Sequence, residues 1–293
     1  MMRYVQGAQL RLAVYEQGDP AAPTVVLVHG YPDTHAMWES VVPRLAEAYH
    51  VVRYDVRGAG ASDTPRATAA YRLEWLTRDL HAVIDAVSPD APVHLVGHDW
   101  GAIQSWEPVT EPGAERRIAS YTAIAGVCLD HVGHWIRERT DSWPGRRQLL
   151  RQLLHSWYVG AFHLPVAAPA VWRFGLARRW HRVLRRLEDV PARPGHPAPT
   201  LAADASHGVR LYRANVLPRL LHPRQRYAHL PVQVIQPTGD HYLLPHFQEG
   251  LERWVPDLTL RLVDAKHWLP LIQPDTVADM VTEFVERIDR RVR

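Results

Sequence analysis

Residues 93–101 read Val-His-Leu-Val-Gly-His-Asp-Trp-Gly and decide the fold that we expect of this chain. An apolar, β-branched run ends at Gly97 and a helix-compatible segment follows Asp99, so the order predicts a strand, a sharp turn and a helix. Glycine at positions 97 and 101 leaves room in a turn that is too tight for a Cβ. Asp99 is therefore expected at the carboxyl end of a strand, where α/β sheets bind ligands. An ordinary turn in which Asp99 caps the helix is the simpler alternative.

Strand-like and helix-like stretches alternate around this turn. Further strands are expected over residues 24–28, 51–54, 118–126, 232–236 and 258–263, with an edge strand over 9–15. Helices are expected over residues 36–48, 71–87 and 275–290. This alternation predicts an α/β fold, with a mostly parallel sheet that is covered by helices on both faces.

The alternation stops within residues 129–229, which hold no strand-like run but many Trp, Arg, Pro and His residues in helix-like pieces. We expect a mainly helical inserted domain there, between two parts of the core at 1–128 and 230–293. Residues 157–177 are apolar, but prolines, glycine and arginine interrupt them, so cap helices are favoured over a membrane span. The prolines of residues 191–199 predict a loop that is a candidate hinge or lid edge.

Composition narrows the classes of function. The 293 residues suffice for a large core, and 34 basic against 31 acidic residues give a formal charge of +3 and a pI near 9.1. The charges are mostly interspersed, which favours a solvated surface over a nucleic-acid partner. The single Cys128 excludes an internal disulfide and a cysteine metal cluster, and it favours a cytoplasmic location. The N-terminus lacks the apolar run of a signal peptide, and a homodimer is compatible with the chain.

Two more loops at the ends of expected strands carry the parts of a catalytic triad. Asp240 and His267 each come shortly after one of the last two strands. In the order Asp99, Asp240, His267 the chain resembles an α/β-hydrolase over nearly its whole length, with the helical insertion as its cap. The resemblance implies that Asp99 is the nucleophile, His267 the base and Asp240 the acid that holds the base. Asp130, after an earlier strand, stays open as an alternative acid, and Lys266 stands where relatives often have glycine.

His29-Gly30-Tyr31-Pro32 resembles the oxyanion loop of this family. The resemblance implies that the backbone N–H groups of Tyr31 and Trp100 point at one spot beside Asp99, and that the Tyr31–Pro32 peptide bond is cis. A carboxylate nucleophile attacks a saturated carbon that bears a leaving group, and it forms an alkyl ester that water then hydrolyses. The expected substrates are therefore epoxides or alkyl halides, and no metal or organic cofactor is required.

Two tyrosines of the insertion favour epoxides. Tyr158, in Tyr-Val-Gly-Ala-Phe, and Tyr212, in Tyr-Arg-Ala-Asn, resemble the two cap tyrosines of epoxide hydrolases of this fold, whose O–H groups serve the oxygen of the opening ring. Halide release would need N–H donors instead. We therefore expect an epoxide hydrolase that forms a vicinal diol from an apolar epoxide and water. A haloalkane dehalogenase with the same triad is the alternative, and a non-catalytic binding protein of this fold is a further one.

Aromatic side chains in and near the insertion indicate a bulky apolar substrate. Four of them are expected to line the substrate slot: Trp157, Phe162, Trp180 and Trp268. The alternative interpretation makes the aromatic residues of the insertion its own hydrophobic core.

Overall fold

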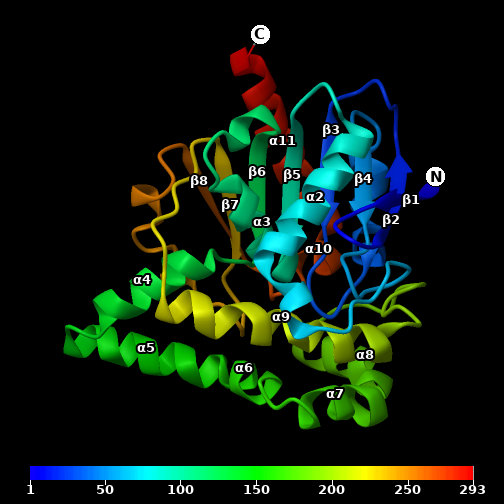
Figure 1. Cartoon of the computed structure of the whole chain (residues 1–293). Coiled ribbons are helices and arrows are strands. Elements are labelled where there is room, and N and C mark those ends of the chain that lie inside the picture. Colours follow the sequence, from blue (N-terminus) through cyan, green and yellow to red (C-terminus); the bar gives the residue numbers. More distant parts are fainter. Residues whose placement is uncertain (293) are drawn as a thin grey trace.

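Eight strands form one sheet at the centre of the computed structural model, which describes residues 1–292 (Figure 1). The strands lie in the order β1-β2-β4-β3-β5-β6-β7-β8. Their bounds are β1 (Met2–Gln6), β2 (Arg11–Gln17), β3 (Thr24–Val28), β4 (His50–Tyr54), β5 (Val93–His98), β6 (Ile118–Ile124), β7 (Val232–Pro237) and β8 (Leu258–Val263). Strands β3 to β8 are parallel to one another, whereas β2 runs antiparallel to both of its neighbours, β1 and β4. The carboxyl ends of β3 to β8 therefore meet at one edge of the sheet.

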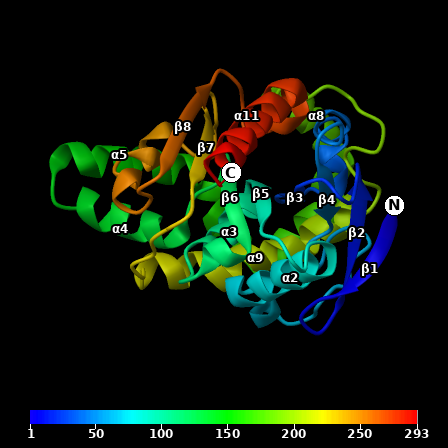
Figure 2. The same ribbon diagram turned by 90° about the horizontal axis from the view of Figure 1, so that it is seen from above.

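Helices cover both faces of the sheet, which confirms the predicted fold class. The core helices are α1 (Val42–Leu45), α2 (Leu73–Val87), α3 (Trp100–Val109), α10 (Leu269–Ile272) and α11 (Pro274–Val292). Short 3-10 helices are η1 (His35–Trp38), η2 (Thr68–Tyr71), η3 (Ala114–Arg116), η5 (Pro245–Gln248) and η6 (Leu251–Arg253). Figure 2 shows α2 and α3 on one side of the sheet and α11 on the other. Strands β3 to β7 are buried almost throughout, as their unbroken apolar runs predict.

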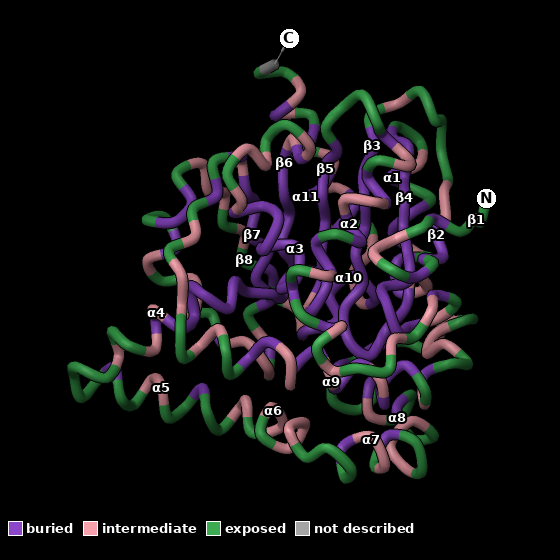
Figure 3. The backbone as a smooth tube through the Cα atoms, viewed as in Figure 1, coloured by how far each residue is buried: buried purple, intermediate pink, exposed green. Residues whose placement is uncertain are grey.

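A layer of helices lies across the carboxyl edge of the sheet (Figure 1). All regular elements between Leu129 and Leu221 belong to this layer: α4 (Leu129–Arg139), α5 (Trp143–His155), α6 (Trp157–Phe162), α7 (Ala167–Val171), the π-helix η4 (Trp172–Leu176), α8 (Ala177–Leu187) and α9 (Leu201–Leu221). Helix α9 and the start of α4 contain most of its buried residues, while much of α5 and α6 faces outward (Figure 3). No helix in the described part of the chain combines the length and the apolar character that crossing a bilayer requires.

One strand was missed, and one predicted helix was wrong. Strand β1 was not predicted, because only Val5 of its five residues is buried and the alternating signal is weak. The single helix expected over 36–48 is instead divided into η1 and α1, since Pro43 can begin a helix but cannot continue one.

The turn after β5 is as tight as residues 93–101 predict. Asp99 has a left-handed φ of 50° and connects β5 directly to α3. A Cβ at Gly97 would lie 2.6 Å from the carbonyl oxygen of Gly101. A Cβ at Gly101 would overlap the carbonyl oxygen of Val28 in the neighbouring strand. Both glycines are therefore required by backbone contacts, which cannot yield as a flexible side chain could.

Replacing Gly101 by alanine should lower the free energy of unfolding by about 3 kcal/mol, because strand β3 and the turn would have to separate. Gly160→Ala is the matched control: the added methyl group meets nothing within 4 Å, and a helical alanine should raise stability by up to about 1 kcal/mol. Urea unfolding of both variants measures the difference. Equal stability of the two variants would contradict the packing argument.

Candidate active site

The carboxylate of Asp99 stands at the carboxyl edge of the sheet and receives two backbone N–H groups. The N–H of Tyr31 donates to Asp99 Oδ2 at 3.2 Å, and the N–H of Trp100 donates to the same oxygen. The Tyr31–Pro32 peptide bond is cis, as the resemblance implied. Two N–H groups that meet at one oxygen form the arrangement that stabilises an oxyanion. The other oxygen, Oδ1, is left to face His267.

Asp99, His267 and Asp240 lie in hydrogen-bond distance of one another, in that order. His267 Nε2 is 3.2 Å from Asp99 Oδ1, and its Nδ1 is 2.8 Å from Asp240 Oδ2. The backbone N–H groups of Tyr242 and Leu243 donate to Asp240 Oδ1, which fixes the carboxylate in its loop. His267 and Asp240 are both buried. This is the geometry in which a histidine can act as a base while a carboxylate orients it.

The alternative acid, Asp130, is engaged elsewhere. Both of its carboxylate oxygens accept hydrogen bonds from the Arg224 guanidinium, which also forms two hydrogen bonds to Glu107. These contacts hold the pKa of Asp130 below its ordinary value despite partial burial. Asp130 therefore belongs to an ion-pair cluster that joins the helical layer to α3, and Asp240 is the carboxylate at His267.

The protonation of His267 is governed by opposing effects. Burial lowers its pKa, but the hydrogen bond and charge of Asp240, together with Asp99, more than offset burial and raise the pKa well above the ordinary value. Both neighbouring carboxylates thus favour the imidazolium. A reaction that neutralised Asp99 would remove one of these two charges and leave His267 held mainly by Asp240.

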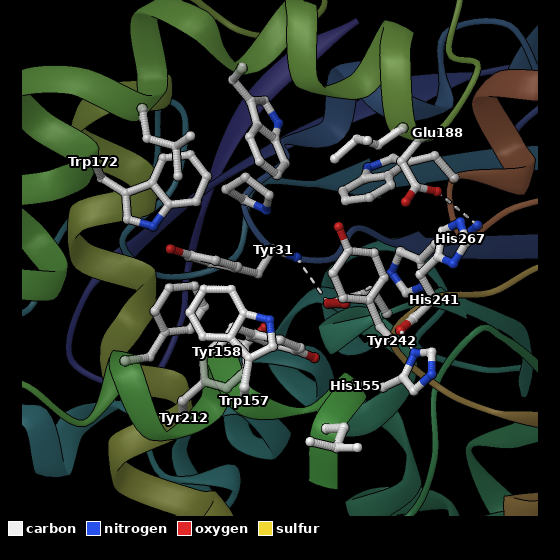
Figure 4. A pocket seen from close by; sticks show the side chains of 18 residues that line it. Tyr31, His155, Trp157, Tyr158, Trp172, Glu188, Tyr212, His241, Tyr242 and His267 are labelled. Atoms are coloured by element: carbon white, nitrogen blue, oxygen red, sulfur yellow. Dashed lines mark hydrogen bonds and ion pairs between the residues drawn. The ribbon is translucent and has the colours of Figure 1, made fainter. Parts of the chain in front are cut away.

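A cavity of about 530 Å³ lies between the sheet edge and the helical layer, with Asp99 and His267 in its wall (Figure 4). Other residues at this cavity include Tyr31, Tyr158, Trp172, Glu188, Tyr212 and Tyr242. All four aromatic residues expected to line the slot also border it, namely Trp157, Phe162, Trp180 and Trp268. Trp180 and Trp268 are buried, whereas Trp157 is largely exposed and stands where the cavity meets solvent.

Tyr158 and Tyr212 face each other in this cavity. Their ring centroids are 6.0 Å apart and nearly perpendicular, and the Tyr212 ring packs 4.8 Å from that of Trp100. Burial, and the nearby charge of Asp99, raise the pKa of both hydroxyls well above the ordinary value. Both tyrosines are therefore neutral O–H donors at physiological pH.

Glu188 is a residue of the site that the sequence did not indicate. It follows α8 directly, and its Oε2 accepts the backbone N–H of His267 at 3.1 Å (Figure 4). Next to it, Asp189 Oδ2 lies 2.6 Å from Lys266 Nζ. The end of α8 is thus attached to the histidine loop by two adjacent contacts, and Lys266, which departs from the expected glycine, makes one of them. No sequence pattern relates residues 188 and 267, so only the fold reveals this pair.

The expected hinge at residues 191–199 is attached to the core as well. Arg193 donates to a backbone carbonyl of α10 at 2.8 Å, and His196 Nε2 lies 2.7 Å from Asp33 Oδ1. Asp33 in turn accepts the indole N–H of Trp268 at 2.8 Å. These contacts argue against a hinge in this loop and connect it to the wall of the cavity.

Burial raises the pKa of Glu188 to about 7, so its carboxyl stays protonated in the folded protein at pH values where the unfolded chain ionises. Folding stability should therefore fall as pH rises from about 4.5 to about 7, by roughly 2–3 kcal/mol for this group. We expect Glu188→Gln to remove this pH-dependent loss. In thermal unfolding, the melting temperature of the variant relative to that of the wild type should therefore be higher at pH 8 than at pH 5. Glu252→Gln, at an exposed carboxyl outside the cavity, should follow the wild-type curve. A difference in melting temperature between variant and wild type that is the same at pH 5 and pH 8 would contradict this prediction.

Comparison with known proteins gives three kinds of similarity. A sequence model described as the α/β hydrolase fold matches residues 23–274. A protein named probable oxidoreductase EphD, from Mycobacterium tuberculosis, is 38% identical over 289 residues, which cover 96% of this chain and 48% of that protein. Epoxide hydrolase A of the same organism is 45% identical over 105 residues, or 36% of this chain and 32% of that one. The matched regions thus span about half the length of the first relative and about a third of the second.

Solved structures share the fold. The epoxide hydrolase VrEH1 from Vigna radiata superposes with a TM-score of 0.79 at 19% identity and covers 98% of both chains. A point mutant of an epoxide hydrolase from Bacillus megaterium, in complex with its diol product, superposes with a TM-score of 0.79 at 20% identity, over 97% of this chain and all of that one. At these identities the likeness concerns the fold.

Proposed function

The chain belongs to the α/β hydrolase fold family, and from this premise we propose that it is an epoxide hydrolase that converts a bulky, apolar epoxide and water into a vicinal diol. One observation carries the proposal: a carboxylate, Asp99, stands where this fold displays its nucleophile and faces both a histidine and two neutral tyrosines. The named epoxide hydrolases among its relatives and structural neighbours support the same reaction.

In the first step, Asp99 Oδ1 attacks a ring carbon of the epoxide. The carbon–oxygen bond of the ring breaks, its electron pair goes to the epoxide oxygen, and that oxygen takes a proton from Tyr158 or Tyr212. The product is an alkyl ester of Asp99. The oxygen that does not attack, Oδ2, stays with the N–H groups of Tyr31 and Trp100.

In the second step, water attacks the carbonyl carbon of the ester. His267 takes the proton of the water, Asp240 stabilises the imidazolium, and the negative charge on Oδ2 is held by the two N–H groups. The ester bond breaks with its electron pair on the departing oxygen, which takes the proton held by His267, and the diol leaves. The carboxyl proton that remains on Asp99 passes to the tyrosinate, so that all side chains return to their starting state. Ester formation has already removed the charge of Asp99, so the imidazolium that forms in this step is stabilised chiefly by Asp240.

The division of labour in the chain follows from this proposal. Residues 1–128 and 230–293 would form the hydrolase core, and residues 129–229 the cap that supplies both tyrosines. A second cavity of about 410 Å³ shares Tyr158 and Tyr212 with the first, which supports a bulky substrate that extends to both sides of the tyrosine pair. The side chains of the triad need no metal or organic cofactor for these steps. The single Cys128 is the basis for proposing a cytoplasmic location.

A substrate panel tests the reaction against its alternatives. We expect turnover of styrene-oxide-like epoxides to diols, detected by chromatography, and no halide release from bromoalkanes. Bromide release without epoxide turnover would assign the chain to the haloalkane dehalogenases, which use the same triad. Binding of either ligand class without turnover would favour a non-catalytic protein of this fold.

Replacing Tyr158 and Tyr212 together by phenylalanine should lower kcat for an epoxide by at least about 10³-fold, because the leaving alkoxide would lose both proton donors. Each single variant should keep part of the activity, since one hydroxyl remains. Stopped-flow turnover of the three variants measures the effect, and Tyr227→Phe, at an exposed tyrosine outside both cavities, is the control. A double variant with the wild-type rate would show that the tyrosines do not serve the epoxide oxygen.

A further inference from the structure

One stretch of the helical layer has a charge pattern unlike the rest of the chain. Residues 142–187, from the start of α5 to the end of α8, contain nine arginines and no aspartate or glutamate. These are Arg146, Arg147, Arg151, Arg173, Arg178, Arg179, Arg182, Arg185 and Arg186. Since the stretch holds none of the 31 acidic residues, the remainder of the chain carries more acidic than basic side chains. The molecule is therefore electrically polar, with its positive end on the helical layer.

The nine arginines are exposed, and within residues 1–292 none of them forms an ion pair with a carboxylate, although Arg146 donates to the backbone carbonyl of Thr140. Elsewhere in the described chain many arginines are paired, as Arg224 is with Glu107 and Asp130. Within α5 to α8 no carboxylate offsets this positive charge, and the nearest exposed carboxylates along the chain, Asp141 and Asp189, stand at the two ends of the stretch.

Large apolar side chains are exposed among these arginines. Trp143 and Trp157 are 73% and 72% exposed. On α5, Leu150 follows Trp143 by seven residues and Leu154 follows Leu150 by four, so these three side chains share one side of the helix, and Trp157 begins α6 three residues later. Farther along the layer the exposed apolar residues are Leu164, Val166, Val171, Phe174 and Leu187. Helices α5, α6 and α7 form the border of the molecule that lies farthest from the chain termini in Figure 1. We call the exposed side chains of residues 142–187 the outer cap surface.

The outer cap surface includes the mouth of the catalytic cavity. Leu154, Trp157 and Leu187 are exposed to solvent and also line the cavity that contains Asp99. A molecule that covered this surface would therefore lie directly at the opening. If that partner is an apolar phase, an apolar substrate held in it would reach Asp99 through the cavity mouth without passing through water.

We propose that the outer cap surface docks on a bilayer of anionic phospholipids, so that the cavity takes its substrate from the lipid phase. Arginines that alternate with exposed Trp, Leu, Phe and Val side chains fit this partner, because the guanidinium groups bind the phosphates and the apolar groups enter the acyl boundary. The acidic remainder of the chain would be repelled by the same membrane, which fixes the orientation. The entry of substrate from the bilayer into the cavity rests on the proposed function, whereas docking on the bilayer does not.

Other partners fit this surface less well. A second copy of the chain would place arginines against arginines, which is repulsive. A nucleic acid would match the charge, but it offers nothing to cover Leu150, Val166 or Phe174. The exposed apolar side chains therefore favour a lipid bilayer over these two partners.

Flotation with lipid vesicles tests the proposal without any substrate. The full chain should float with vesicles of equal parts phosphatidylglycerol and phosphatidylcholine at about 0.05 M NaCl, bind pure phosphatidylcholine weakly, and lose binding at about 0.5 M NaCl. Arg147→Glu with Arg151→Glu should reduce the partition coefficient by about tenfold or more. Trp143→Ser with Leu150→Ser should reduce it as well, since both side chains are exposed and outside the cavities.

Arg116→Glu with Arg290→Glu is the matched control, because it changes the charge equally on exposed residues at the other end of the molecule. This variant should float like the wild type. The proposal fails if no variant or wild-type protein floats, if the two pairs of arginine variants bind alike, or if the protein binds a single-stranded RNA oligonucleotide but not anionic vesicles. Turnover of a water-soluble epoxide by the Arg147 and Arg151 variant should be unchanged, so loss of docking and loss of the reaction are distinguishable.

Discussion

Asp99→Ala should reduce epoxide turnover by about 10⁴-fold or more, because no other carboxylate at the cavity has the geometry to form the ester. The variant should still fold. It loses the hydrogen bond from the Trp100 N–H to the Asp99 side chain and places alanine at a left-handed φ, which together should lower stability by about 2 kcal/mol. Measurement of kcat together with thermal unfolding separates the two effects. Retained turnover in the folded variant would remove Asp99 from the mechanism.

Isotope labelling gives this prediction its sharpest form. In a single turnover in ¹⁸O water, the wild-type enzyme should place the label in the carboxylate of Asp99, because water attacks the ester carbonyl and the diol keeps an oxygen of the enzyme. Mass spectrometry of the peptide that contains residues 93–101 detects it. Label that appeared in the diol of the first turnover would instead indicate direct attack of water on the epoxide.

His267→Gln should stop turnover after one cycle of ester formation. Asp99 can still attack the epoxide, but no base remains within reach of the water, so the ester accumulates and kcat falls by about 10³-fold or more. The peptide with Asp99 should gain the mass of the substrate. His81→Gln, on α2 and away from both cavities, should show neither effect. Full turnover by the His267 variant, or its failure to gain mass while still binding substrate, would contradict the assigned role.

The triad and the oxyanion loop, which could be predicted from the sequence, share one property: each of their residues follows a strand of the parallel part of the sheet. Unbroken apolar runs located β3, β5 and β7 closely, so Asp99, Asp240 and the oxyanion loop after β3 had to meet at one edge of the parallel sheet. The structure brings these groups into one site, where His267 connects the two carboxylates and the oxyanion loop donates to Asp99. Parallel topology, and not similarity alone, makes this inference possible.

What the sequence left undecided depends on contacts between distant segments. Asp130 and Asp240 both follow strands, and only the position of Arg224, on the loop after α9, shows that Asp130 is already paired. Glu188 has no motif, because its partner is a backbone N–H and nearly any residue at position 267 provides one. Weak periodicity explains why β1 was missed.

The contacts that attach the loop after α8 to the core have a consequence for timescales. If Glu188, Asp189, Arg193 and His196 hold this side of the cap in place, capture of substrate would not await a domain motion of microseconds to milliseconds. It would be limited by rotamer changes of exposed side chains at the mouth, such as Trp157, which occur in picoseconds to nanoseconds. Binding should then show a single concentration-dependent phase, with no saturating conformational step before it.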